Sequence, residues 1–113
     1  MNNLNININL INYSPILVIP VSDILLCMKN YWPLIDWKLT QAPQNHESNL
    51  LFLDSSKAHQ HLEWKPVWSI EESIKETVVW YRSLLEKGEV VSIAQLESYV
   101  KKAKLSGLKW SIS

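Results

Sequence analysis

Glycine is scarce in this 113-residue sequence, which contains only Gly88 and Gly107, both in its last third. A dinucleotide-binding fold or a P-loop needs several glycines between a strand and the helix that follows it, because the backbone there must approach phosphate groups closely. Two isolated glycines can form neither kind of phosphate-binding loop. The sequence therefore excludes both a dinucleotide-binding fold and a P-loop within this chain.

Cysteine and an excess of one charge are also lacking. A single cysteine, Cys27, excludes an intramolecular disulfide and is typical of a reducing compartment. Lysine plus arginine and aspartate plus glutamate both number 11, so the formal net charge is zero. The dense basic run KKAK, residues 101–104, suits a solvated helix end that the helix dipole favours. We expect no nucleic-acid partner, because such proteins usually carry a one-sided basic surface.

Long uninterrupted apolar runs are missing as well. The stretch PILVIPVSDILLCM, residues 15–28, is broken by Pro20 and Asp23 and is too short to span a bilayer. No lysine or arginine precedes Lys29, so the cationic start of a signal peptide is missing. We expect no membrane partner and a cytoplasmic location.

The first third of the chain contains two candidate elements. Residues 2–12 alternate asparagine with leucine or isoleucine, which indicates a strand with one apolar face inside an Asn-rich segment. A helix is predicted from Ser22, with Ser22 or Asp23 as its N-cap and Pro33 as its end. The residues expected on its inner side follow helical spacing and are Ile24, Met28 and Trp32.

Two strand candidates follow, separated by a segment of loop composition. LIDWKL, residues 34–39, predicts a short strand, and NLLFLD, residues 49–54, predicts a buried one. A short helix is predicted next, with Asp54, Ser55 or Ser56 as its cap. It carries Ala58 and Leu62 and ends at the turn EWKP, residues 63–66.

The clearest signals belong to a long helix. Ser69 and Glu72 form an S-x-x-E capping box at its start, and Gly88 is placed to end it. Its apolar positions step by three or four and predict one buried face, made of Ile70, Ile74, Thr77, Val78, Tyr81, Leu84 and Leu85.

The C-terminal part predicts one more helix. A second box, Ser92 with Gln95, is expected to open it, and residues beyond Lys104 are expected to form a tail. The residues predicted to point inward are Ile93, Leu96 and Val100. Three tryptophans, Trp64, Trp68 and Trp80, are predicted to clamp the short helix to the long one.

No metal site is predicted. His59 and His61 lie two residues apart on a helix and do not face each other, and no acidic or cysteine partner stands at ligand spacing. Cys27 lies in an apolar helix and is interpreted as a core residue.

One loop, PQNHES at 43–48, carries groups that suit a ligand. The amides of Gln44 and Asn45 and the imidazole of His46 can donate hydrogen bonds to a phosphate or a sugar hydroxyl. They can equally lie in a solvated connection between two strands. The residues alone leave both interpretations open.

A resemblance to a known family covers roughly Ile11 to Lys102. LDSSKAHQHLEWKPVWSIEESIKETVVWYRSLL, residues 53–85, resembles the C-terminal segment of the extended short-chain dehydrogenase/reductase (NAD-dependent epimerase/dehydratase) superfamily. There a D-x-S-K-A helix, an L-G-W-x-P turn and a helix ending near T-V-x-W-Y recur. Three further stretches are similar to the CDP-glucose 4,6-dehydratase family within it: INYSP with PVSDILLCMKNYW, PQNHE, and VSIAQLESY.

The resemblance implies an α/β fold: the C-terminal substrate-binding lobe of such an enzyme, mainly helices with a few short strands, with the Rossmann half absent. Residues 1–10 form an Asn-rich segment with a candidate strand, 11–104 the lobe and 105–113 a tail. Whole family members oxidise the hexose C4 with bound NAD, eliminate water across C5 and C6, and return the hydride. Their NAD-binding glycines and Tyr-x-x-x-Lys pair have no counterpart here, so no catalytic, cofactor-binding or metal-binding residue is assigned.

What the resemblance implies for a site is limited to contacts with a nucleotide sugar. Asn12 and the loop residues Gln44, Asn45 and His46 are expected near the nucleotide diphosphate. The chain departs from the family at Ser14 and Glu63, where the family has glycine, and at Asn45, where it often has proline. The glycine at the position of Glu63 takes a left-handed backbone conformation, which costs a non-glycine residue about 1 kcal/mol.

The function expected from the resemblance is that of a truncated or split CDP-glucose 4,6-dehydratase-like lyase that is not catalytic alone. The alternative is a free-standing helical protein-interaction module derived from the same lobe. The expected partners are a nucleotide sugar, a separate Rossmann half, and other copies of the chain. Self-association is expected through apolar surface in residues 16–19 and 50–52.

Overall fold

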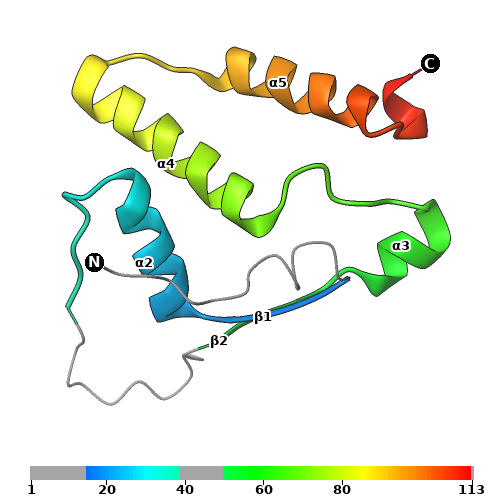
Figure 1. Ribbon diagram of the computed structural model, residues 1–113, viewed down its shortest axis with the longest axis horizontal. Coiled ribbons are helices and arrows are strands. Elements are labelled where there is room, and N and C mark those ends of the chain that lie inside the picture. The colour runs from blue at the N-terminus through cyan, green and yellow to red at the C-terminus, as the bar shows by residue number, and fades with distance from the viewer. Residues whose placement is uncertain (1–14, 39–49, 113) are drawn as a thin grey trace.

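The computed structural model describes residues 15–38 and 50–112. The elements in chain order are β1 (Ile16–Pro20), α2 (Val21–Tyr31), β2 (Leu50–Asp54), α3 (Ser56–Leu62), α4 (Ile70–Lys87), α5 (Ser92–Leu105) and the 3-10 helix η1 (Lys109–Ser111). Helices predominate and the two strands form one small sheet, which agrees with the expected α/β class (Figure 1). The candidate strand at 2–12 lies outside the described residues.

The sheet is a single antiparallel pair. β1 and β2 pair in the register Ile16↔Asp54, Val18↔Phe52 and Pro20↔Leu50. Because facing residues share a side of the sheet, Val18 and Phe52 lie on one face and Ile19 and Leu51 on the other. Ile19 is 1% exposed whereas Phe52 is 63% exposed, so the face of Phe52 is open and the face of Ile19 is covered at Ile19. Leu53, on the same face as Ile19, is 53% exposed, so that face is covered only in part. The strand predicted at 49–54 is confirmed, but its expected burial is wrong for Phe52 and Leu53.

The core lies between α2 and α4. Cys27 of α2 packs with Ile74 and Val78 of α4. The inner positions predicted for α2 all pack against this cluster: Ile24, Met28 and Trp32. The prediction that Cys27 is a core residue is confirmed.

Two expectations about the region around α2 are wrong. Its N-cap is Pro20, in an extended conformation, and neither Ser22 nor Asp23 caps the helix. Proline is tolerated at this position because the backbone nitrogen of an N-cap residue makes no hydrogen bond within the helix. The strand expected at 34–39 is absent from its described part, residues 34–38. The amide of Ile35 donates instead to the carbonyl of Trp32, so the chain turns at this point and Ile35 joins the core.

The signals for α4 are confirmed at both ends. The Ser69 hydroxyl accepts from the amide of Glu72, and the Glu72 carboxylate accepts from the amide of Ser69. Gly88 ends the helix with φ of 68°, in the left-handed region. The predicted buried face is only partly formed: Ile74 and Val78 are buried, whereas Tyr81 and Leu85 are exposed. The reason is that the core with α2 covers only the N-terminal part of α4.

The interior of the α5 region differs from the prediction. Val91 is the N-cap, and Ser92 and Gln95 form no capping box because both side chains contact α4. Ile93 and Leu96, predicted to point inward, are exposed, while Ala103 is fully buried. Residues after Lys104, expected as a tail, complete α5 and contain η1, in which Ser111 is buried.

The tryptophans also have other partners than predicted. Trp68 meets Tyr99 of α5 edge to face, with ring centroids 5.1 Å apart. The indole nitrogen of Trp80 donates to the hydroxyl of Ser92 at 2.8 Å, and Trp64 contacts His59. Trp68 and Trp80 thus join the α4 region to α5, and the predicted clamp between α3 and α4 is wrong.

None of the helices in the described ranges has both the length and the hydropathy that a membrane crossing requires.

Candidate functional site

The four residues predicted to contact a nucleotide sugar, Asn12, Gln44, Asn45 and His46, lie outside the described residues. The structure does define where their segments join the sheet. β1 begins at Ile16, beside the end of β2 at Asp54, whereas β2 begins at Leu50, beside the end of β1 at Pro20. Those attachment points are separated by the length of a five-residue strand, about 14 Å. The expected site therefore stays a prediction.

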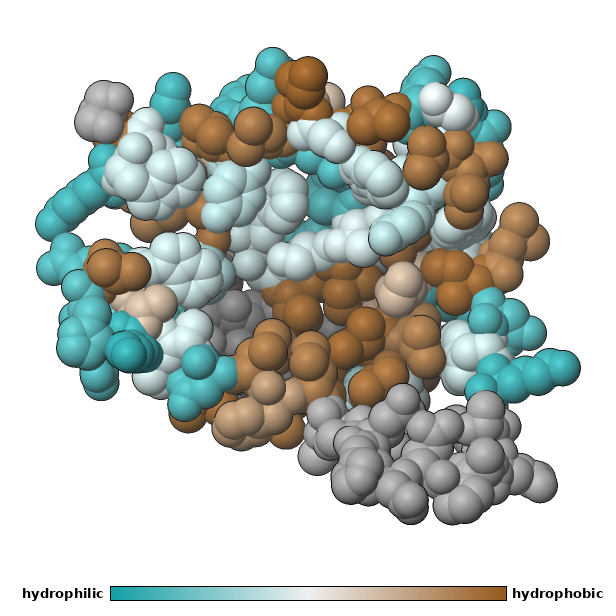
Figure 2. All heavy atoms as spheres, turned by 180° about the vertical axis from the view of Figure 1, so that it is seen from behind, coloured by the Kyte–Doolittle hydropathy of each residue, from teal (hydrophilic) through white to brown (hydrophobic). Residues whose placement is uncertain are grey.

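Between these attachment points lies an apolar surface, which we call the sheet face. It consists of Ile16 and Val18 on β1 and Phe52 on β2, all exposed. Figure 2 shows apolar residues gathered in the centre and lower half of one side of the molecule. An isolated exposed apolar residue is ordinary, but apolar residues that adjoin on two paired strands form a surface suited to a partner.

The start of α3 is fixed to the end of the sheet by short-range hydrogen bonds. The Asp54 carboxylate accepts from the amide of Ser56 at 2.9 Å and from its hydroxyl at 2.5 Å. These bonds hold the pKa of Asp54 below its usual range. The amide and the hydroxyl of Ser55 both donate to the carbonyl of Pro15, at 2.8 and 3.2 Å. The helix after the strand therefore leaves the sheet in a defined direction. Of the three predicted cap candidates, Ser55 is the N-cap of α3, and its side chain makes no capping hydrogen bond.

The end of α3 carries the unusual backbone that the resemblance implies. Glu63 has φ of 52° and ψ of 25°, the left-handed region, and no other non-glycine residue of the described chain has positive φ. The following amide, of Trp64, donates to the carbonyl of Ala58 and closes the helix. A glycine would take this conformation without the clash between Cβ and backbone. Glu63 therefore stands in a glycine-type position, as expected.

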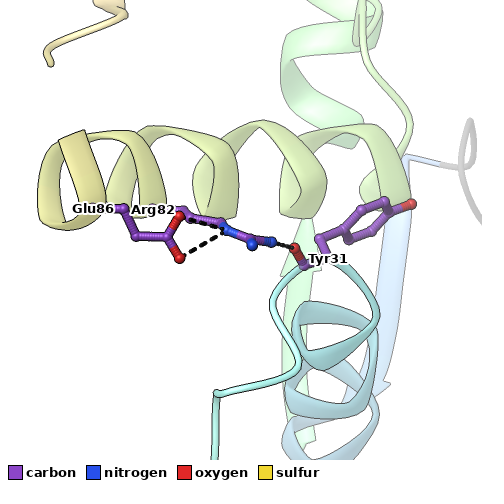
Figure 3. A network of polar contacts seen from close by, with 3 residues as sticks. All are labelled: Tyr31, Arg82 and Glu86. Carbon is purple, nitrogen blue, oxygen red and sulfur yellow. Dashed lines mark hydrogen bonds and ion pairs between the residues drawn. The ribbon is translucent and has the colours of Figure 1, made fainter.

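A polar network fixes α2 on α4 at the edge of the core. Arg82 of α4 donates to the backbone carbonyl of Tyr31 at 2.9 Å and to the carboxylate of Glu86 at 3.1 Å (Figure 3). The Tyr31 ring points away from Arg82, and its hydroxyl donates to Glu71 at 2.9 Å. Burial and this contact with Glu71 raise the pKa of Tyr31 to about 12. The network holds α2 in position and leaves Tyr31 protonated at neutral pH.

The described residues supply no reactive group of the kinds considered from the sequence. Cys27 is 2% exposed, and burial followed by the nearby Glu71 raises the pKa of its thiol, so it is not an activated thiolate. No set of three or more His, Cys, Asp or Glu side chains in the described ranges could hold a metal ion. What this part of the chain presents is a two-stranded sheet with an exposed apolar face, followed by helices.

One element of this surface was not predicted. β1 falls in the run ILVIP, which was interpreted above only as an interrupted apolar stretch. A short run of branched apolar residues between two prolines is itself a strand signal, because Ile and Val favour extended backbone. Its partner, β2, is about 30 residues further along the chain, and local sequence does not reveal that pairing.

The fold and its surface define a small, mainly helical α/β chain whose two-stranded sheet leads into a short helix with a left-handed end. No protein-family model and no solved structure matches it. The chain is 30% identical over 61 residues to CDP-glucose 4,6-dehydratase from Salmonella typhimurium strain LT2. The match covers 54% of this chain but only 17% of the length of that protein. This similarity supports a distant relationship.

Proposed function

We propose that this chain acts as the nucleotide-sugar-binding lobe of a CDP-glucose 4,6-dehydratase-like protein, and that it needs a separate NAD-binding half for catalysis. The observation that carries the proposal is the 30% identity over 61 residues to a CDP-glucose 4,6-dehydratase. The left-handed backbone of Glu63 supports it, because the family has a glycine at that position. NAD would be held by the other half, since neither Gly88 nor Gly107 follows a strand.

The sheet face is the surface proposed to meet the NAD-binding half. Val18 and Phe52 are neighbours on paired strands, lie on the same face of the sheet and are both exposed. Ile19, on the opposite face, is buried. A domain-sized partner would remove this apolar area from water. Such burial stabilises a contact by about 25 cal/mol for each Å² of apolar surface buried. The nucleotide sugar would bind next to this contact, with Asn12, Gln44, Asn45 and His46 donating to its diphosphate and sugar groups.

The direct test measures CDP-glucose binding by calorimetry and CDP-glucose turnover, for the chain alone and co-expressed with the NAD-binding half of the Salmonella enzyme. We expect that the chain alone does not turn over CDP-glucose. We expect CDP-glucose to bind only to the complex of the chain with the NAD-binding half. The double variant Gln44→Ala/His46→Ala should weaken binding about tenfold or more, because two hydrogen bonds to charged groups are lost. Ser48→Ala, in the same loop, serves as the matched control. Turnover by the chain alone, or a complex that ignores CDP-glucose, would contradict the proposal.

An exposed apolar face has a second consequence, which is self-association of the isolated chain at micromolar concentration. Phe52→Lys places a charge on the sheet face and should shift the sedimentation coefficient toward the monomer. Ile93→Lys makes the same change on α5, which also exposes apolar side chains, and should have little effect. A stable monomer before any substitution would argue against the sheet face as a contact surface.

The alternative function, a free-standing interaction module, is favoured by one observation. Ile93 and Leu96 lie on one side of α5 and are exposed, Ile93 by 75%. A partner helix could pack on such a stripe. The same pair of variants distinguishes the functions: the module predicts that Ile93→Lys removes association while Phe52→Lys leaves it unchanged.

A further inference from the structure

A hollow lies between the end of α3 and the C-terminal end of the chain, away from the core between α2 and α4. We call it the Trp groove. Its volume is about 630 Å³, within the range typical of small-molecule sites. The residues that define its walls and rim are Leu62, Trp64, Lys65, Leu108, Lys109 and Trp110. An adjoining hollow of about 440 Å³ shares Lys65 and Leu108 with it and adds Lys102.

Both walls are held by backbone geometry. On one side the left-handed Glu63 turns the chain so that Trp64 and Lys65 border the groove. On the other, Gly107 has φ of 72°, and the amide of Leu108 donates to the carbonyl of Ala103 at 3.1 Å. The chain thereby folds back past the end of α5 and carries the residues of η1 to the groove.

The two indoles are also fixed by ring contacts. Trp64 meets the ring of His59, with centroids 5.7 Å apart and the planes nearly perpendicular. Trp110 stacks on Tyr99, with centroids 6.1 Å apart and planes 26° from parallel. Each ring is still partly exposed, so each keeps surface for another planar group. The Nε2 atom of His59, on the groove wall, is buried with no hydrogen-bond partner among the described residues.

The charges at the rim are mainly positive. Lys65 and Lys109 border the Trp groove, against the single carboxylate of Glu63, whereas Lys102 of the adjoining hollow is already paired with Glu72. Lys109 is paired with Glu63 at 3.3 Å, but the two side chains are 90% and 79% exposed. An ion pair so exposed contributes little to stability, so an incoming anion can replace Glu63 as the partner of Lys109.

From this arrangement we propose that the Trp groove binds a small planar ligand with a negative charge, an aromatic carboxylate or phosphate. The ring would lie against Trp64 and Trp110, and the anion would accept hydrogen bonds from the ammonium groups of Lys65 and Lys109. The proposal rests on the groove alone and does not depend on the proposed function.

The test titrates the full chain with phenyl phosphate, benzoate, phenol and inorganic phosphate while NMR follows the indole N–H signals of Trp64 and Trp110. We expect phenyl phosphate or benzoate to shift both signals in a saturable way. Phenol, which lacks the charge, and inorganic phosphate, which lacks the ring, should each bind at least about tenfold more weakly. If only one of the two aromatic anions binds, it identifies the anionic group.

Lys65→Gln should weaken binding of the aromatic anion about tenfold while the circular dichroism spectrum stays unchanged. Lys75→Gln, an exposed position on α4, is the matched control and should leave the affinity unchanged. Trp110→Leu should remove the ring contribution. The proposal is overturned if no probe shifts the indole signals at millimolar concentration, if phenol binds as tightly as the anions, or if Lys65→Gln has no effect.

Discussion

α4 contacts a helix on either side of it, and the two contacts are built from different forces. α2 is held by an apolar core of Cys27, Ile74 and Val78, with a polar network at its edge. α5 is held by side-chain hydrogen bonds, by the Lys102–Glu72 ion pair and by the edge-to-face pair Trp68–Tyr99. Apolar burial is non-directional, whereas hydrogen bonds and ring pairs depend on distance and angle. The α5 contact should therefore be the first to open.

Truncation in the α2–α4 core should have the largest effect. Ile74→Ala removes three carbons from a buried site, and we expect the free energy of unfolding to fall by about 2–4 kcal/mol. Ile93→Ala makes the same change at an exposed position and should cost less than about 0.5 kcal/mol. Urea denaturation of both variants measures the difference. Equal losses would mean that the core is not where the structure places it.

Tyr99→Ala should have the next largest effect, and a local one. It removes the ring that contacts both Trp68 and Trp110, each such pair contributing about 0.5–1.5 kcal/mol. We expect hydrogen exchange to accelerate in α5 and η1 while the amides of α2 keep their protection. Phe52→Ala is the control, because it truncates an exposed ring on β2, outside the α5 contact. Loss of protection throughout the chain would show that the two contacts open together.

Glu63→Gly tests a position at the end of α3, which belongs to neither of the two contacts of α4. The change removes the strain of a left-handed non-glycine residue and should stabilise the chain by about 0.5–1 kcal/mol. Glu63→Ala keeps Cβ while removing the carboxylate, and it should give no such gain. A lower melting temperature for Glu63→Gly would mean that Glu63 adopts an ordinary helical conformation in solution.

The smallest expected effect is a pH dependence of the α5 contact. Partial burial raises the pKa of Glu72, but hydrogen bonds from Lys102 and Ser69 outweigh it and lower that pKa below the ordinary 4.5. Because the folded pKa is the lower one, this stabilisation is present above about pH 4.5 and is lost as the pH falls through the folded value. Both side chains are about one-third exposed, so the contribution is below about 1 kcal/mol.

Glu72→Gln should abolish that part of the acid sensitivity, so that variant and wild type converge in stability between pH 6 and pH 3. Glu97→Gln, an exposed carboxylate on α5, provides the control for the loss of one negative charge. If the free energies of unfolding of Glu72→Gln and wild type differ by a constant amount across this range, the ion pair does not stabilise the α5 contact.

The features predicted from sequence are those that neighbouring residues determine. The Ser69–Glu72 box and the Gly88 end of α4 each depend on a few adjacent positions, and both are confirmed. The left-handed conformation of Glu63 was implied by the family resemblance, and it is also present. The inner side of α5 was predicted wrongly. The spacing of its apolar residues indicates that they share one side of the helix, but it does not show whether that side packs against α4. Ser92 and Gln95 have capping-box spacing, yet tertiary contacts with α4 take both side chains.

The surfaces were harder to predict than the elements. The sheet face depends on pairing β1 with β2, which are separated in the sequence by α2 and residues 32–49. The Trp groove depends on the turn at Gly107, which brings Trp110 across from Trp64, and no local motif marks that approach. The residues Asn12, Gln44, Asn45 and His46 were inferred from family resemblance and remain a prediction.

The ring contacts of Tyr99 give the α5 contact a spectroscopic signature. Tyr99 lies between Trp68 and Trp110, with centroid distances of 5.1 and 6.1 Å. Transitions of rings this close couple in a fixed geometry and should produce near-ultraviolet circular dichroism that depends on the docked helix. Detachment of α5 without its unfolding would remove the part of that signal due to the Trp68–Tyr99 pair, while the far-ultraviolet helical spectrum persists. The native chain therefore reports on its weaker contact without any added label.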